Sequence, residues 1–400
     1  MQKFKIFGIV AAVLIFTLSF ATNSEAKSKK LVANWIASEK NILVLGKADL
    51  VNGAGVKQAI IEATTQKLHS LKAAGKLPFE LKESNGGEDV DFFQLANSRL
   101  DFSDEELQIG IIPIVALDNA YASSYSIFNK LGMTFHKDIV TSSIYFVVMS
   151  TNQDGQPPRI LASIPMSGCI VLGSRTPTGV PFAKETEIEA YKNLTVGMIN
   201  NELDFTAIKK ALNDWEKKQI IGEVYQVTDV EISSAKANEI FASSGDKAEI
   251  KSIIANFFTA EHQKKTKKIL LPPILNDQDR GAVKEVEAGM KSIGSFKAHG
   301  SSGVNELQYE QPSQSRQIKL DFSGANYGEM QRSEKNASDV RADWAYKAWL
   351  DKTMNGKTVG FDESRLVAMP KNNANFKIDK KEIFTDLLIG LAKKLGAAKG

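Results

Sequence analysis

A short segment that is apolar on both faces constrains the fold of this chain more than any other feature. The segment is Ser143–Ser150. Its two alternating sets of side chains are both apolar: Ile144, Phe146 and Val148 in one, Tyr145, Val147 and Met149 in the other. Successive side chains of a strand point to opposite faces, so neither face of this strand suits water. We therefore expect it to be covered on both sides, as in the interior of a layered fold.

The residues that follow predict an antiparallel hairpin. Asp154-Gly155 suits a tight turn because glycine adopts positive φ readily, and Pro157-Pro158 cannot donate to a ladder. Arg159–Met166 then returns as a second strand with apolar residues on one face. We expect this hairpin at the centre of a sheet. A pair of buried strands in an all-β fold is the alternative, but the flanking segments have helical patterns, which favours a layered α/β domain.

Chain length and the order of patterns predict two domains. The 400 residues exceed what one ordinary core organises. Helical periodicity at 56–71 and 185–218 accompanies strand-like segments in the first half. We expect an N-terminal α/β domain at 27–225, a helical connector at 226–264 and a C-terminal α/β domain at 265–400. The predicted class is α/β, with α+β as the alternative, and with mixed sheets arranged around the antiparallel hairpin.

The second half has patterns of its own. We expect a glycine- and serine-rich loop at Gly294–Gly303, and a helix that Ser338 caps and that carries Trp344 and Trp349. A final helix with an apolar stripe is expected at Phe384–Leu395.

The two halves share a short sequence similarity. Lys40-Asn-Ile-Leu-Val aligns with Lys267-Lys-Ile-Leu-Leu, and the same alignment brings Val56-Lys57 onto Val283-Lys284. In both places a strand leads through a loop to an amphipathic helix. An internal duplication would explain the match, and chance similarity between two βα units is the alternative.

The N-terminus has the pattern of a signal peptide. Basic residues in Met1–Lys5 precede the apolar run Ile6–Phe20, and Ser24 and Ala26 occupy the small positions of a cleavage site. The run is shorter than the roughly 20 residues of a membrane-spanning helix. We expect export to the periplasm or the medium and cleavage after Ala26, which leaves no integral membrane segment. An uncleaved anchor is the alternative.

Charge and cysteine content exclude several classes. A net charge of +3 is too small to indicate binding to nucleic acid or to an anionic membrane. Cys169 is the single cysteine, so no disulfide can form within one chain. Its apolar neighbours predict a buried small hydrophobe. A reactive thiol or an intermolecular bridge is the alternative.

Two segments resemble a known family. Lys268-Ile-Leu-Leu-Pro-Pro-Ile-Leu is similar to the opening strand of the periplasmic α/β domains of curli-secretion lipoproteins and of the amino-terminal domain of TolB. The hairpin that ends in Arg159-Ile-Leu-Ala-Ser-Ile resembles their late hairpin. The chain lacks the lipoprotein cysteine of the curli group. The resemblance implies envelope assembly or partner binding rather than catalysis, and it assigns no functional residue.

Searches for catalytic and metal-binding patterns identify no site. The four histidines have no ligand spacing, and no zinc signature is present: His69, His136, His262 and His299. We expect no metal and no cofactor. Neither a dinucleotide fingerprint nor a G-x-S-x-G nucleophile elbow occurs.

The remaining pattern supports several functions. Four acids cluster at Asp101, Asp104, Glu105 and Glu106, and a solvated helix start explains them better than a glycosidase pair. We expect a non-enzymatic binding or assembly role in the cell envelope, with a protein or envelope partner and no catalytic residue that the sequence identifies. One alternative is a secreted hydrolase built from distant residues, for which the acids at 101–106 and Ser301-Ser302 are the first candidates. The other is a periplasmic solute-binding protein that holds its ligand between the domains.

Overall fold

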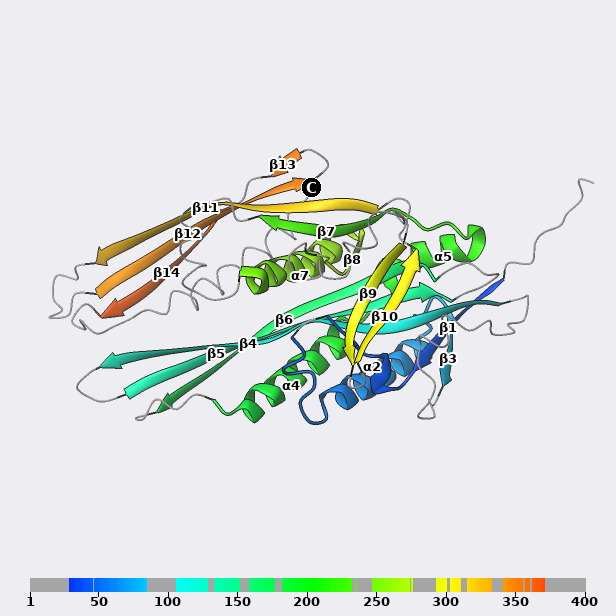
Figure 1. Ribbon diagram of the computed structural model, residues 1–400, viewed down its shortest axis with the longest axis horizontal. Helices are drawn as coiled ribbons and strands as arrows, with labels where there is room; N and C mark the ends of the chain where they lie inside the picture. The colour runs from blue at the N-terminus through cyan, green and yellow to red at the C-terminus, as the bar shows by residue number, and fades with distance from the viewer. Residues whose placement is uncertain are drawn as a thin grey trace, which may run out of the picture.

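A computed structural model shows an α/β fold with two large mixed sheets (Figure 1). The structure describes residues 29–45, 47–84, 106–128, 133–151, 158–176, 182–231, 235, 247–273, 275, 293–300, 303–310, 315–332, 341–354, 357–359 and 362–370. The predicted α/β class with mixed sheets is confirmed.

The first sheet has the strand order β3-β1-β4-β5-β6, and a short strand β2 pairs with β4. Its pairs β1–β3, β1–β4 and β2–β4 are parallel, whereas β4–β5 and β5–β6 are antiparallel. The strands are β1 (Lys30–Ile36), β2 (Leu43–Val44), β3 (Glu80–Ser84), β4 (Glu106–Phe128), β5 (Met133–Ser150) and β6 (Ile160–Thr176).

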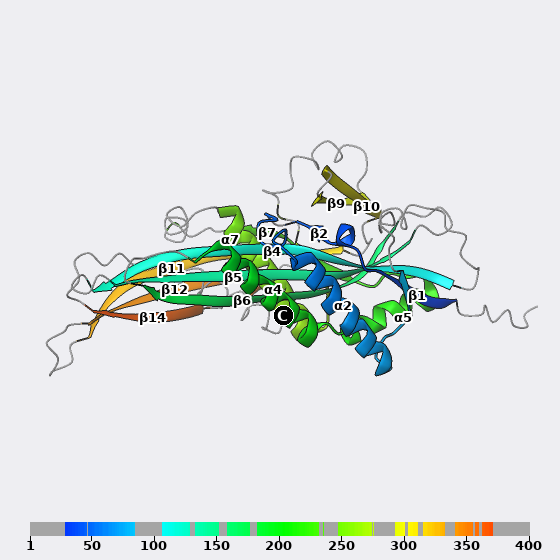
Figure 2. The same ribbon diagram turned by 90° about the horizontal axis from the view of Figure 1, so that it is seen from below.

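Two helices cover one face of this sheet (Figures 1 and 2). They are α2 (Val56–Ala73) and α4 (Lys184–Glu202). On α2, Thr65 accepts a hydrogen bond from the Trp35 indole of β1 at 2.8 Å, and Thr195 of α4 shares one with Ser142 of β5 at 2.8 Å. A short 3-10 turn at Thr206–Ile208 then leads into α5 (Lys209–Lys218), and another 3-10 turn lies at Glu39–Asn41.

The predicted hairpin pairing is confirmed. β5 and β6 are antiparallel, with Ile144 opposite Met166 and Phe146 opposite Ile164. The apolar segment of β5 is buried throughout, as its two apolar faces require. Its position in the sheet differs from the expectation, because β5 lies inside the sheet and β6 forms an edge. The predicted turn at Asp154-Gly155 lies outside the described residues.

The second sheet has the order β13-β12-β11-β7-β8, with β14 also paired to β12. A separate antiparallel hairpin is formed by β9 (Ile293–Gly300) and β10 (Gly303–Glu310). The strands of the second sheet are β7 (Val224–Glu231), β8 (Ile269–Leu271), β11 (Ser315–Arg332), β12 (Arg341–Met354), β13 (Lys357–Val359) and β14 (Asp362–Pro370).

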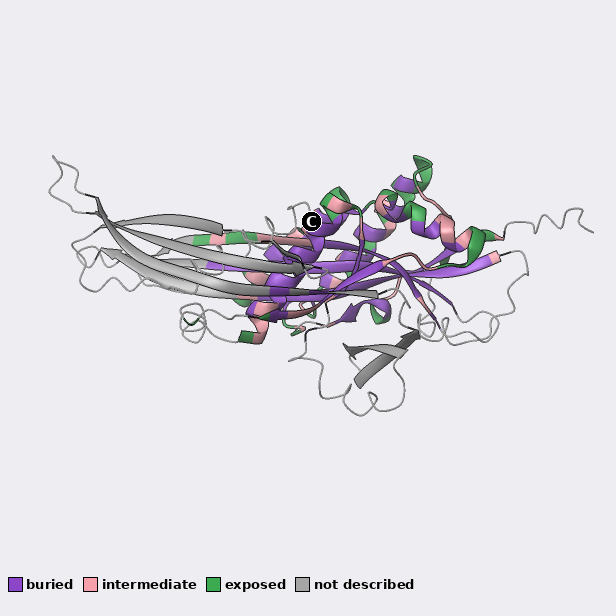
Figure 3. Ribbon diagram, turned by 90° about the horizontal axis from the view of Figure 1, so that it is seen from above, coloured by how far each residue is buried: buried purple, intermediate pink, exposed green. Residues whose placement is uncertain are grey.

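Helix α7 (Lys247–Thr266) lies between the two sheets (Figure 1). Every residue from Ser252 to Ala260 is buried, which is the pattern of a helix packed on more than one side. The layers are therefore α2 and α4, the first sheet, α7 and the second sheet. Figure 3 shows that buried residues lie in the strands and on the inward sides of the helices.

The two sheets repeat one strand order. The series β8-β7-β11-β12-β14 reproduces β3-β1-β4-β5-β6, with the same parallel and antiparallel neighbours. A helix connects the first two strands in each case, α2 in one sheet and α7 in the other. The sequence alignment of Lys40 with Lys267 is nevertheless wrong for this repeat. It equates β2 with β8, although β2 pairs with β4 and β8 pairs with the first strand of its own sheet.

Two predictions for the second half are wrong. Residues Gly294–Gly300, expected in a loop, belong to β9, and the helix expected after Ser338 is strand β12, which contains Trp344 and Trp349. In both places the segment pairs with another strand, and this pairing overrides its local preference for a loop or a helix. The helix expected at Phe384–Leu395 lies outside the described residues.

The division into domains at 226–264 stays a prediction. Within that range the structure places most of β7 and of α7. Three residues of the second sheet, Val224, Ile269 and Leu271, belong to the same apolar cluster as the core of the first. The two sheets thus share packed residues through β7 and β8.

Candidate functional site

The outer half of β6 is an exposed sheet edge with apolar side chains. Among the described strands, β6 pairs only with β5. Its residues Ile160–Met166 are buried, whereas Ile170 is 38% exposed and Val171 is 47% exposed. Adjacent strand residues point to opposite faces, so both faces of β6 lose their cover at this point.

Helix α4 packs closely on β6 at Gly168. A side-chain carbon built at Gly168 would lie 2.8 Å from Met198 Sδ and 3.0 Å from Leu194 Cδ1, both on α4. At Gly173 of the same strand nothing lies within 4 Å of such a carbon. The two glycines are five residues apart and so face opposite sides of the sheet. We call the stretch that contains both of them the β6 outer edge (167–173).

The β6 outer edge lacks the usual protection of an edge strand. Its sequence, Ser-Gly-Cys-Ile-Val-Leu-Gly, contains no charged residue and no proline. Exposed edges are normally protected by lysine, proline or short length, because their free N–H and C=O groups can pair with another chain. This segment combines a strand side with which no described strand pairs and the exposed aliphatic side chains of Ile170 and Val171, which is the chemistry of strand addition.

Cys169 lies in this edge and is only partly buried. The expectation of a buried, shielded cysteine is therefore wrong. Cys169 alternates with Gly168, which faces α4, so its side chain lies on the other face of the sheet, where apolar neighbours in the sequence do not ensure cover. Cys169 forms no disulfide.

A buried polar contact fixes α7 on the inner half of the hairpin. Asn256 Oδ1 accepts a hydrogen bond from the Tyr145 hydroxyl at 2.8 Å, and the Asn256 carbonyl accepts one from Ser167 at 3.1 Å. Further along the helix, Gln263 Nε2 donates to the Ser163 carbonyl at 2.6 Å, and Gln263 Oε1 accepts from the Leu270 amide at 2.7 Å. Gln263 therefore joins β6 of the first sheet to β8 of the second.

Asp118 on β4 anchors the loop that precedes α2. Its carboxylate accepts hydrogen bonds from the backbone N–H groups of Ala48 at 3.2 Å, Leu50 at 3.2 Å and Val51 at 3.4 Å. Burial raises the pKa of the Asp118 carboxyl above its ordinary value, although the three N–H groups act in the opposite direction. The arrangement orders a loop, and Asp118 is fully buried rather than open to a ligand.

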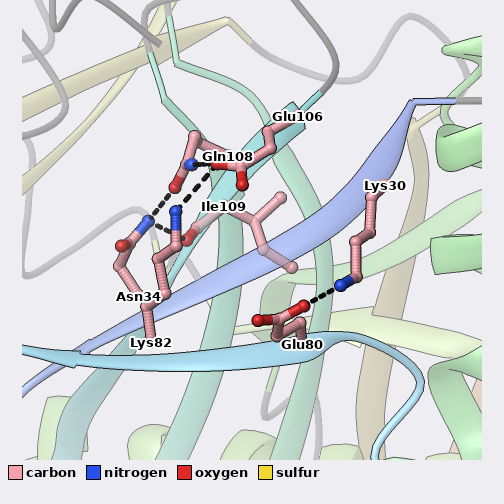
Figure 4. A network of polar contacts seen from close by, with 7 residues as sticks. All are labelled: Lys30, Asn34, Glu80, Lys82, Glu106, Gln108 and Ile109. Carbon is pink, nitrogen blue, oxygen red and sulfur yellow. Dashed lines mark hydrogen bonds and ion pairs between the residues drawn. The ribbon is translucent and has the colours of Figure 1, made fainter. Parts of the chain in front are cut away.

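Glu106, one of the four predicted acids, belongs to a cross-strand network on β1, β3 and β4 (Figure 4). It accepts hydrogen bonds from Lys82 at 2.8 Å and from Gln108 Nε2 at 2.7 Å. Gln108 Oε1 in turn accepts from Asn34 at 2.6 Å, and Lys30 pairs with Glu80 beside it. Glu106 therefore neutralises a lysine on a strand face.

Residues 101–105 and Ser301-Ser302 lie outside the described part of the chain.

Two of the histidines, His69 and His262, have structural partners. His69 Nε2 lies 2.7 Å from each carboxylate oxygen of Glu83, and His262 is buried and stacks on Phe258 with ring centroids 5.1 Å apart. Within the described ranges, no group of three His, Cys, Asp or Glu side chains is placed to hold a metal ion.

The fold and this edge define the protein as an α/β protein of two stacked sheets with an exposed strand edge. No protein-family model matches the sequence, and no curated protein does. Among solved structures, the chain is similar to a neuraminyllactose-binding hemagglutinin homolog from Helicobacter pylori. That similarity has 10% sequence identity and a TM-score of 0.27 and covers 48% of this chain and 90% of that one. None of the described helices has both the length and the apolar composition needed to cross a membrane.

Sequence reasoning missed the β6 outer edge, Asn256 and Asp118. The edge has a signal in the sequence, since seven consecutive uncharged residues follow the buried first half of the same strand. Asn256 and Asp118 are single polar residues whose partners lie far away in the chain, and no local pattern marks them.

Proposed function

We propose that the protein is an exported, non-enzymatic binding protein that captures an envelope partner by strand addition at the β6 outer edge. The observation that carries the proposal is the exposure of Ile170 and Val171 on an unprotected edge of a 17-residue strand whose first half is buried. An added strand would pair with the outer edge of β6 and cover both side chains. Export is inferred from the apolar run Ile6–Phe20 and the cleavage pattern that ends at Ala26.

The rigid attachment of β6 supports this role. The inner half of the strand is held by β5, by α4 and, through Ser163 and Ser167, by α7. The outer half is therefore presented in a fixed extended shape, which lowers the entropy lost when a partner strand pairs with it.

Site-specific photo-crosslinking tests the proposal. A benzophenone amino acid at position 170 or 171 of the full chain should yield a discrete protein adduct in the envelope of the producing cell. The matched control is position 220, because Ile220 is also an exposed apolar residue, at 54%, but belongs to no strand. Adducts of equal yield at 220, or none at 170 and 171, would contradict the proposal.

Charge substitution gives an independent test. Ile170→Lys with Val171→Lys should abolish the adduct formed by a crosslinker at position 173, because charged side chains oppose strand addition. Far-ultraviolet circular dichroism of the purified variant should match the parent, since both side chains are exposed. An adduct that survives the double substitution would place the partner on another surface.

A further inference from the structure

Helix α5 has a basic face that the fold leaves uncovered. At about 100° per residue, its buried side chains Ala211, Leu212 and Trp215 share one side of the helix. The same spacing places three exposed lysines away from that side, Lys209, Lys210 and Lys217, whereas the exposed Lys218 ends the helix about 20° from Ala211. Lys210 pairs with Asp214 at 2.5 Å. Within the described part of the chain, no ion pair holds the other three.

An exposed aliphatic residue extends this face. Gln219 ends α5 in the left-handed conformation, with φ of 51°. Ile220, the next residue, is 54% exposed, the most exposed of the large apolar residues in the described ranges. Its neighbour Ile221 is half-buried and packs against the core. Ile220 is therefore exposed next to Lys217 and Lys218 in the sequence, and Ile221 attaches this turn to the core.

The start of β1 lies beside α5. The Leu31 amide donates a hydrogen bond to Glu216 Oε1 of α5 at 3.3 Å. Figures 1 and 2 both place α5 and the start of β1 at the same end of the molecule. The described residues begin at Lys29, and the apolar run Ile6–Phe20 precedes it in the sequence. The first described residues therefore lie next to α5, and this apolar run precedes them in the sequence.

We propose that the outer face of α5 together with Ile220 is a docking surface for an anionic phospholipid bilayer. Lysines that face a bilayer are attracted to anionic headgroups, and an exposed aliphatic side chain can enter the boundary between headgroups and acyl chains. The small net charge of the whole chain does not oppose this, because screening limits the attraction to charges within about 10 Å of the surface.

This orientation suits the proposed binding edge. The outer half of β6 extends to the end of the molecule opposite α5 (Figure 1). A bilayer at α5 would leave the β6 outer edge directed away from the membrane and open to a partner chain. The membrane surface does not depend on the strand edge, since the two use different residues.

Vesicle co-sedimentation tests the surface. The chain without residues 1–26 should sediment with vesicles of phosphatidylcholine and phosphatidylglycerol at low salt, and much less with vesicles of phosphatidylcholine alone. High salt should release it, because salt screens the lysines. Absence of sedimentation with the anionic vesicles at low salt would overturn the proposal.

A matched pair of variants separates this face from general basic charge. Lys217→Glu with Lys218→Glu should lower the affinity for anionic vesicles more than about tenfold. Lys264→Glu with Lys265→Glu is the control, because these lysines also lie in the last turn of an exposed helix end, that of α7. Equal losses in both variants would contradict a defined surface.

Ile220→Ser provides a third measurement that does not alter charge. It should weaken binding to the anionic vesicles while the dependence on salt stays the same. Circular dichroism and the urea midpoint should remain those of the parent, since Ile220 is exposed. Binding that is unchanged by this substitution would remove Ile220 from the surface and contradict the proposal as stated.

Discussion

The Tyr145 hydroxyl on β5 donates a hydrogen bond to Asn256 Oδ1 on α7 at 2.8 Å, and both residues are buried. Asn256 Nδ2 is itself satisfied within the helix, by the Ser252 carbonyl at 2.8 Å. The contact fixes the rotation of α7 on the first sheet, because only one face of the helix offers an acceptor to Tyr145. Buried polar contacts of this kind give an interface a single geometry.

Replacement of Asn256 by leucine is expected to destabilise the protein by about 1–3 kcal/mol, because the Tyr145 hydroxyl loses its acceptor in a buried place. The urea midpoint of the full chain measures the change. Tyr145→Phe in the leucine background should cost less than in the parent, since the unpaired hydroxyl has then been removed. Strict additivity of the two substitutions would show that the residues are not coupled.

Asp118→Asn is expected to destabilise the protein by about 1–3 kcal/mol. The amide replaces one acceptor oxygen by a donor, which then faces the backbone N–H groups of the loop 47–51. Hydrogen exchange should increase at the amides of Leu50 and Val51, which donate to Asp118. Unchanged exchange at these amides would show that the carboxylate does not hold the loop.

The raised pKa of Asp118 also gives a direction for the dependence of stability on pH. A carboxyl whose pKa is higher in the folded state binds its proton more tightly there, so the associated stability is present below the unfolded pKa of 3.8 and is lost as the pH rises through the folded value. The difference in unfolding free energy between parent and Asp118→Asn should therefore change over this range and become constant above it. A difference that is constant from acid to neutral pH would contradict the raised pKa.

The hairpin was predictable from the sequence because its signal is local. Ile144, Phe146 and Val148 face residues of the returning strand that are only one turn away in the chain. The edge position of β6 was not predictable in the same way. It depends on the order of all strands in the sheet. β4 pairs with β1 and β5, β5 pairs with β6, and no described strand pairs with the other side of β6.

The tryptophans of β12 show why the secondary structure of the second half was harder to predict from the sequence. Trp344 pairs with Glu329 and Trp349 with Gly324 across β11. Between them, alanine and lysine are good helix formers, and a serine cap precedes them. Pairing with β11 on one side and β14 on the other gives the segment its extended form, and neither partner is visible in a local window.

Gly168→Val is expected to destabilise the protein by about 1–3 kcal/mol, because the new side chain would overlap Met198 and Leu194 of α4. Gly173→Val is the matched control in the same strand, where nothing lies within 4 Å, and it should be nearly neutral. Thermal unfolding of both variants measures the contrast. Equal effects would show that the close approach of α4 does not limit the side chain at position 168.

The last prediction concerns the segment that connects the two halves of the chain. The sequence predicts a connector at 226–264, and connectors between independent domains are cut readily and release their domains. In the structure, α7 within that range donates from Gln263 to Ser163 of the first sheet and accepts from Leu270 of the second.

We therefore expect the two pieces to remain associated after the chain is cut between Glu231 and Lys247. A specific protease site inserted there, followed by cleavage and size-exclusion chromatography, makes the measurement. The pieces should co-elute without denaturant, because α7 stays packed on β5 and β6, and β7 stays paired with β8 and β11 across the cut. Addition of Asn256→Leu should weaken the association, since it removes one of the buried contacts that hold α7. Pieces that separate without denaturant, each with a cooperative unfolding transition, would instead establish the two independent domains that the sequence predicts.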